Sequence, residues 1–294
     1  MEKLIQCPVC SSEQFNQVLT CTDYTTTNEE FVICQCTDCS FRFTNPRPDI
    51  NNSGKYYQSE EYISHTDSNK GLLNKAYQIA RDYMISTKYK STLKKYKSKS
   101  LVDYGCGTGD FLKYCIDKGH QAIGLEIEES ARKIAIDKGC KEVYSPDRLT
   151  NIKPGSVDII TLWHVLEHIH DLLPTIQQFN RILTRNGTIV IAVPNHQSYD
   201  ARCYGKYWAA YDVPRHLYHF NVASMTRLMN DKGFSLIETR TMRLDPFYIA
   251  LLSNKYQTSR MNPIKAIYVG VIANLKTLFN ISNSSSIIYI FKKQ

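Results

Sequence analysis

The stretch that most constrains this chain is residues 101–119, which open with L-V-D-Y-G-C-G-T-G-D-F-L. The first apolar residues predict the end of a buried strand, and the alternate glycines predict a tight turn. Phe111, Leu112, Cys115 and Ile116 then recur at helical spacing. Glycines in such a turn allow positive φ and let a ligand approach without a Cβ in the way. The stretch therefore predicts a strand, a ligand-binding turn and a helix.

The glycine spacing is not that of nucleotide-phosphate binders. G-x-G-x-G stands in place of G-x-G-x-x-G, and Asp103 precedes the first glycine by two residues. A carboxylate there would repel a pyrophosphate but suits the ammonium group of an amino acid. The next predicted strand, residues 121–125, ends at Glu126, near the roughly 20-residue offset at which an acidic side chain binds ribose hydroxyls. A nucleoside with an amino-acid tail describes S-adenosylmethionine, the expected cofactor.

Three motifs in this order resemble the class I S-adenosylmethionine-dependent methyltransferases. They are D-Y-G-C-G-T-G, G-L-E at residues 124–126 and L-W-H-V-L-E-H at residues 162–168. The resemblance runs from residue 100 to the C-terminus, except for residues 245–283. It implies an α/β fold with a Rossmann-like, seven-stranded sheet. It also implies a cofactor site formed by Asp103, Gly105, Cys106, Gly107, Gly109, Glu126, Ile127, Leu162 and Trp163.

Downstream of the turn, predicted strands alternate with predicted helices, which implies a parallel sheet covered on both faces. The strands are expected at residues 142–144, 157–162, 187–193, 234–242 and 287–291. Residues 245–283, before the last strand, are too long for a hairpin loop. Their apolar run falls short of the roughly 20 residues that a membrane span needs. The sequence therefore favours an inserted helical pair beside the active site, with contact to a membrane surface as the alternative.

Six of the ten cysteines precede residue 40, which in a reducing compartment indicates a metal rather than disulfides. Two C-x-x-C knuckles supply four thiolates, the closed set that structural zinc prefers. The predicted ligands are Cys7, Cys10, Cys36 and Cys39. Cys34 is expected to lie in a strand, and Cys21 is expected to take no part in metal binding. Buried free thiols are the alternative, and a redox C-x-x-C would need a helix start.

The predicted organisation has three parts: a zinc-ribbon-like module at residues 1–48, a linker with lid helices at residues 49–99, and the methyltransferase domain at residues 100–294. The lysine-rich run at residues 88–99 is interpreted as the solvated face of a helix with one apolar stripe. Three tyrosines are candidate lid residues: Tyr56, Tyr57 and Tyr62. The absence of an N-terminal signal predicts a cytoplasmic protein.

Two histidines are the candidate general bases. His164 follows the predicted strand at residues 157–162, at the end where open parallel sheets bind ligands. It also begins an H-x-x-E-H match to helical zinc sites, but the family shows L-E-H here without metal. His216 belongs to the loop after the fifth predicted strand, within D-V-P-R-H-L. His168 is instead expected to make a buried structural hydrogen bond.

That loop, residues 195–220, also gathers aromatic residues and is predicted to form a wall of the acceptor pocket. In the alternative interpretation, Trp208 and Phe220 anchor the loop to the core, and the two interpretations can both hold. A histidine with a pKa near the working pH can remove the acceptor's proton during methyl transfer.

The sequence thus predicts methyl transfer from S-adenosylmethionine to a small-molecule acceptor, with a sugar or glycan precursor as the leading class because zinc-knuckled relatives include sugar methyltransferases. An RNA methyltransferase is the alternative, favoured by the net charge of +8. A non-catalytic module that only binds the cofactor is the third hypothesis.

Overall fold

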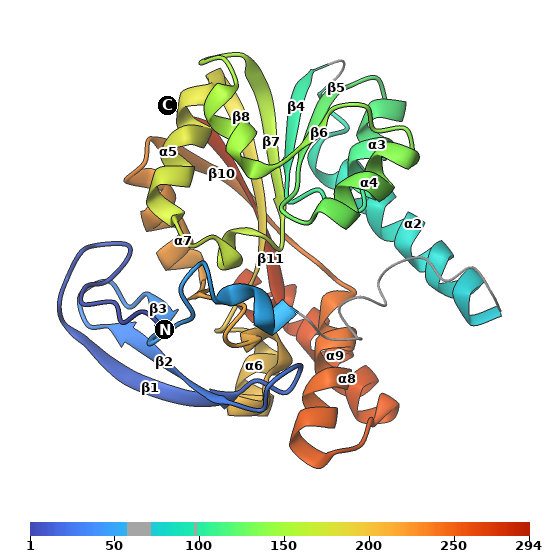
Figure 1. Cartoon of the computed structure of the whole chain (residues 1–294). Helices are drawn as coiled ribbons and strands as arrows, with labels where there is room; N and C mark the ends of the chain where they lie inside the picture. The colour runs from blue at the N-terminus through green and yellow to red at the C-terminus, as the bar shows by residue number, and fades with distance from the viewer. Residues whose placement is uncertain (58–71, 97–98) are drawn as a thin grey trace.

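The computed structural model describes residues 1–57, 72–96 and 99–294, and residues 72–80 by their backbone alone (Figure 1). The candidate lid residue Tyr62 lies outside the described residues. The main feature of the fold is a seven-stranded sheet in the order β10-β11-β8-β7-β4-β5-β6. Its strands are β4 (Ser100–Tyr104), β5 (Gln121–Leu125), β6 (Val143–Tyr144), β7 (Val157–Trp163), β8 (Leu183–Pro194), β10 (Phe234–Thr241) and β11 (Ser286–Lys293).

The sheet is mostly parallel, as the sequence predicts. Four neighbouring pairs are parallel: β4 with β5, β4 with β7, β5 with β6, and β7 with β8. In contrast, β11 is antiparallel to both β8 and β10. The strand order reverses beside β4, so the glycine turn that follows β4 lies at the crevice where such sheets bind ligands. The predicted α/β fold with a seven-stranded methyltransferase sheet is confirmed.

Helices cover both faces of this sheet (Figure 1). On one side lie α2 (Leu72–Thr92), α3 (Asp110–Asp117) and α4 (Glu129–Asp137), and on the other lie α5 (Leu172–Ile182) and α7 (Val222–Asn230). Neighbouring strand residues point to opposite faces. Leu101 accordingly joins a core with Leu112 of α3, while Val102 joins a core with Phe179 of α5. Burial on both faces explains why these strands are almost wholly apolar.

The N-terminal strands form a second sheet with part of the loop that follows β8. It has the order β1-β2-β3-β9, with β1 (Phe15–Thr22), β2 (Glu30–Cys36), β3 (Arg42–Thr44) and β9 (Tyr218–His219). β3 pairs with β9 antiparallel, and the Phe41 ring lies 5.9 Å from Tyr218 and 5.4 Å from Phe220. The N-terminal strands are therefore packed directly onto the D-V-P-R-H-L loop.

Residues 245–283 form the predicted helical pair, α8 (Asp245–Thr258) and α9 (Pro263–Thr277), beside α6 (Tyr199–Tyr204). The two helices approach closely, because a Cβ on Gly270 would lie 2.4 Å from Cδ1 of Phe247. Among the described helices, none combines the length and apolarity needed to cross a bilayer. Short 3-10 helices complete the fold: η1 (Ser53–Tyr57), η2 (Pro146–Asn151), η3 (Leu166–His168), η4 (Gly205–Tyr207), η5 (Ala209–Tyr211) and η6 (Ile281–Asn283).

Candidate active site

In the glycine turn between β4 and α3, Gly105 is closely packed against a neighbouring side chain, whereas Gly107 faces open space. Gly105 has φ +76°, and a Cβ there would lie 2.3 Å from Cγ2 of Val165. Gly107 has φ +53°, yet a Cβ there would meet nothing within 4 Å. Only glycine suits the first position for packing, while the second leaves free space beside the backbone. This space fits a ligand that approaches the turn closely, as the predicted cofactor must.

Two carboxylates flank the turn. Asp103 is buried at the end of β4, where it accepts a 2.6 Å hydrogen bond from Oγ1 of Thr161. Burial raises its pKa to about 6, although the Thr161 bond acts in the opposite direction. Glu126 follows β5, and its carboxylate accepts from the backbone amides of Gly107 at 2.8 Å and Glu128 at 3.0 Å. The structure thus brings the two predicted acidic residues to one turn.

The other predicted cofactor residues occupy different environments. Ile127 is 73% exposed beside Glu126 and offers an apolar surface to a flat base. Cys106 and Leu162 are buried, so only their backbones can face the cofactor. Trp163 packs edge-on against Phe111 with ring centroids 5.0 Å apart.

A lysine that the sequence interpretation assigned to a solvated face lies at this site. Nζ of Lys88 is 4.8 Å from the centroid of the Trp163 ring. Burial lowers its pKa, although Asp245 and Asp103 act to raise it. An ammonium group near Asp103 can bind the carboxylate of an amino-acid tail. The rest of the lysine-rich segment, residues 89–96, agrees with the prediction, since Tyr89 and Leu93 of its apolar stripe are buried.

His164 directly follows β7 and has φ +57°, a conformation rare outside glycine. Its Nε2 lies 3.3 Å from Oδ2 of Asp245, and its Nδ1 lies 3.5 Å from Oε1 of Glu167. Burial acts to lower the pKa of His164, but the two carboxylates prevail and raise it to about 9. His164 is therefore a cation at neutral pH. Asp245 begins α8, and its role escaped the sequence interpretation.

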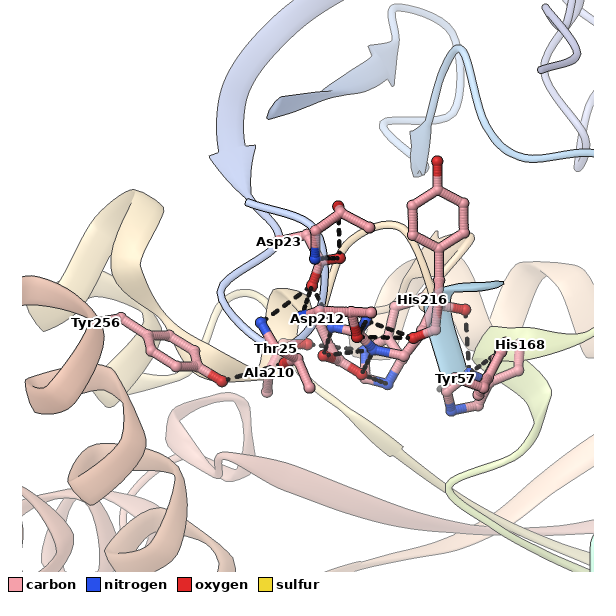
Figure 2. Close-up of polar contacts among 12 residues, drawn as sticks. Asp23, Thr25, Tyr57, His168, Ala210, Asp212, His216 and Tyr256 are labelled. Carbon is pink, nitrogen blue, oxygen red and sulfur yellow. Dashed lines mark hydrogen bonds and ion pairs between the residues drawn. The ribbon is translucent and has the colours of Figure 1, made fainter. Parts of the chain in front are cut away.

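His216 is buried on the D-V-P-R-H-L loop (Figure 2). Its Nδ1 donates a 2.9 Å hydrogen bond to the carbonyl oxygen of Ala210. The neutral ring consequently carries its lone pair on Nε2. That nitrogen lies 4.0 Å from Oε1 of Glu167 and 3.9 Å from Oδ2 of Asp212. An imidazole held in this tautomer between two carboxylates can accept a proton.

Glu167 and His168 complete this group of side chains. Glu167 is fully buried, and neither of its carboxylate oxygens has a hydrogen-bond partner. Burial acts to raise its pKa, but the neighbouring histidines hold it below the usual range. One ligand atom each from Glu167, His168 and His216 lies within 4.8 Å of the others. These three residues can relay a proton or hold a cation, and His164 adjoins them through Glu167.

His168 makes the hydrogen bonds expected of a structural residue. Its Nδ1 lies 3.0 Å from the carbonyl oxygen of Arg215, to which it donates, and 3.2 Å from the hydroxyl of Tyr57 (Figure 2). Burial and the charge of His216 lower its pKa to about 4. It is therefore neutral at neutral pH. Tyr57, one of the candidate lid residues, thus contacts the site from the N-terminal side.

An ion-pair network ties the loop to the β1–β2 turn. Arg215, 2% exposed, donates from Nη2 to Asp23 at 2.9 Å and to Asp212 at 2.6 Å, and from Nη1 to the carbonyl oxygen of Tyr56 at 2.9 Å. Asp23 in turn accepts the backbone amides of Thr25, Thr26 and Thr27. Tyr56 is 2% exposed and packs on Phe31, so it belongs to the core and not to a lid.

The aromatic residues of this loop mostly support it from within. Trp208 and Phe220 are 2% and 1% exposed, and Nε1 of Trp208 donates to Asp200 at 2.7 Å. Tyr204 and Tyr218 are also buried. These four side chains anchor the loop to the core, and the expectation of a pocket wall stays a prediction.

The N-terminal cysteines form a separate cluster. Sγ of Cys7 lies 3.5 Å from Sγ of Cys39, and Sγ of Cys10 lies 3.6 Å from Sγ of Cys36. In a tetrahedral zinc–thiolate site the sulfurs would stand about 3.8 Å apart. The two knuckles have matching turns, because the amides of Ser11 and Ser40 bond back to the carbonyls of Cys7 and Cys36 at 2.9 and 3.0 Å. The donor set and its spacing fit structural zinc.

The two other N-terminal cysteines lie apart from this cluster. Cys21 is buried against Phe31 in a different part of the core. Cys34 lies within β2, as predicted, and its Sγ donates to the carbonyl oxygen of Asn45 at 3.8 Å.

Comparison with known proteins agrees with this fold. Residues 77–239 match the model of a methyltransferase domain family, and the chain belongs to that family. The ubiquinone biosynthesis O-methyltransferase of Cupriavidus pinatubonensis is 25% identical over 175 residues, which cover 55% of this chain and 68% of that protein. The chain is a class I S-adenosylmethionine-dependent methyltransferase.

Two of the solved structures that share the fold illustrate the similarity. An Archaeoglobus fulgidus S-adenosylmethionine-dependent methyltransferase superposes with a TM-score of 0.50 at 20% identity, covering 72% of this chain and 94% of that one. Phosphoethanolamine N-methyltransferase 2 of Haemonchus contortus, in complex with S-adenosylmethionine, gives 0.51 at 17% identity, covering 72% and 52%.

Proposed function

We propose that this methyltransferase methylates a hydroxyl oxygen of a small-molecule acceptor bound beside His216. The observation that carries the proposal is the tautomer of His216, whose Nδ1 hydrogen bond to Ala210 leaves the lone pair on Nε2. The acceptor oxygen attacks the methyl carbon of the cofactor, the carbon–sulfur bond breaks, and Nε2 takes the hydroxyl proton. Glu167 and Asp212 then stabilise the imidazolium.

His164 has a different role in this proposal. With a pKa of about 9 it holds a proton at neutral pH and is a poor base there. Its positive charge instead stabilises the negative charge that develops on the acceptor oxygen. Asp245 and Glu167 fix the ring in place.

The cofactor is proposed to lie across the glycine turn. Asp103 is assigned to its ammonium group, Lys88 to its carboxylate, Glu126 to the ribose hydroxyls and Ile127 to the adenine ring. The free space beside Gly107 supports this placement. S-adenosylmethionine supplies an electrophilic methyl group, and these residues align it with the acceptor.

The acceptor class is the finer part of the proposal. The Cupriavidus relative is named for O-methylation, which supports an oxygen acceptor. Among small molecules we put a sugar or glycan precursor first, on the resemblance to zinc-knuckled sugar methyltransferases. Cytoplasmic location stays a prediction.

A labelling experiment tests the acceptor class. Purified protein is incubated with methyl-labelled S-adenosylmethionine and, separately, with nucleotide sugars, with phenolic small molecules and with total RNA. Label in a small-molecule pool supports the proposal, and label in the sugars supports its finer form. Label only in RNA would establish the alternative, and cofactor binding without transfer to any pool would favour a non-catalytic module.

We also propose that Cys7, Cys10, Cys36 and Cys39 bind one structural zinc ion. The sulfur spacing and the matching knuckles support it. With four thiolates the coordination is closed, so the metal would stabilise the small sheet rather than take part in catalysis.

A further inference from the structure

The outer face of α9 carries an apolar stripe whose side chains are largely exposed in the described part of the chain. At about 100° per residue, its five helical members fall within an arc of about 100°. Two more residues extend the stripe through the turn that ends the helix. The members, called the α9 stripe below, are 43–92% exposed: Ile264, Ile267, Tyr268, Val271, Leu275, Leu278 and Phe279.

The opposite face of α9 is firmly packed, so the exposed stripe does not reflect a loosely held helix. Ala266, Val269 and Ala273 are at most 4% exposed. Gly270 allows close contact with Phe247 of α8. At the N-terminus of the helix, the side chain of Asn262 accepts the amide of Lys265 at 2.9 Å. α9 therefore presents a rigid apolar surface to its surroundings.

The charged residues that follow Asp245 in the helical pair all have one sign. Residues 246–283 contain four basic residues, Lys255, Arg260, Lys265 and Lys276, and no acidic residue. Lys265 and Lys276 are eleven residues apart, which places them on one flank of the stripe. Both are exposed. An apolar face flanked by cations complements acyl chains beneath anionic headgroups.

We propose that the α9 stripe docks onto the surface of an anionic lipid bilayer. Its apolar side chains enter the boundary between headgroups and acyl chains, while Lys265 and Lys276 contact lipid phosphates. The attachment is peripheral, in keeping with the absence of a spanning helix among those described. The same helical pair supplies Asp245 to His164, so the docked surface and the active site share one rigid unit. Methyl transfer as proposed above does not require this contact.

Vesicle sedimentation tests the proposal with the whole 294-residue chain. Vesicles of phosphatidylcholine alone are compared with vesicles that also contain phosphatidylglycerol, and binding is expected only to the anionic ones. Replacing Ile264 and Phe279 together by serine should weaken binding at least about tenfold. Exchange of Lys265 or Lys276 for glutamine should weaken it about fivefold each, from about 1 kcal/mol per basic residue.

A matched control distinguishes binding through the α9 stripe from non-specific binding through any exposed apolar side chain. Ile5→Ser changes an isoleucine that is 76% exposed, against 82% for Ile264, on a distant surface, and should leave vesicle binding unchanged. Unchanged cofactor binding in every variant verifies folding. Three results would overturn the proposal: no binding to anionic vesicles, equal binding to both compositions, or a wild-type dimer in sedimentation velocity that Ile264→Ser abolishes. The last result would assign the stripe to a second copy of the chain.

Discussion

Replacing Asp23 by asparagine should destabilise the protein far more than a single conservative change on its surface. The carboxylate is 1% exposed and accepts hydrogen bonds from Arg215, from the amides of Thr25, Thr26 and Thr27, and from the Thr27 hydroxyl. Both oxygens of Asp23 accept hydrogen bonds, so whichever way the asparagine amide is turned, its NH₂ group would face at least one N–H or O–H donor. The cost is that of breaking a buried ion pair.

The expected loss is about 3 kcal/mol, at the lower end of the range for a broken buried pair, because Arg215 keeps Asp212 as a partner. For a chain of this size that corresponds to a fall in Tm of about 6–12 °C. Urea unfolding followed by circular dichroism measures the free energy directly. The control is Asp117→Asn, which removes an exposed ion pair with Lys113 and should cost under about 0.5 kcal/mol. If the two variants were equally stable, the network would not join the N-terminal strands to the loop as described.

Three further predictions concern the cofactor, the metal and pH. Glu126→Gln should weaken S-adenosylmethionine binding by about 1.5–3 kcal/mol in calorimetry, because a charged ribose contact is lost; wild-type affinity would end that assignment. Cys36→Ser should lose zinc in elemental analysis and Cys34→Ser should keep it. The reverse result would show that Cys34, and not Cys36, is the zinc ligand. The folded-state pKa of His164 is raised from 6.5 to about 9, so its ion pairs stabilise the protein fully below about pH 6.5, and up to about 2–3 kcal/mol is lost as pH rises through 9. Asp245→Asn should flatten that loss in urea unfolding, and an equally steep loss in the variant would refute the pairing.

The sequence predicted the central sheet because its signals are local. The turn at Gly105 and Gly107, the acidic residues Asp103 and Glu126, and the apolar strands each specify their own conformation within a few residues. Their order along the chain then leaves little choice of topology. The same holds for the helical pair at residues 245–283 and for Asn221, whose side chain caps α7 at Ser224.

What the sequence missed depends on contacts between distant segments. β9 pairs with β3 across more than 170 residues, and no local pattern marks that pairing. The sequence predicts that Lys88 faces solvent because lysine-rich helices usually expose that face, whereas in the fold it is half-buried with its Nζ over the Trp163 ring. Asp245 had a usable signal, since it follows β10 at the end of the sheet where ligands bind. Trp208 and Phe220 show the converse, because aromatic residues on a loop serve packing as often as binding.

The most direct test of the account compares His216→Gln with the wild-type protein, using an acceptor that the labelling experiment identifies. Glutamine can still donate to the Ala210 carbonyl but cannot accept the hydroxyl proton. His170→Gln is the control, since His170 bonds only to the backbone of Pro48 among the contacts described for its ring. The account predicts that His216→Gln binds S-adenosylmethionine with wild-type affinity and transfers methyl groups about 10²–10⁴-fold more slowly, while the control keeps both properties. Unchanged turnover, or a large loss of cofactor affinity, in His216→Gln would contradict it.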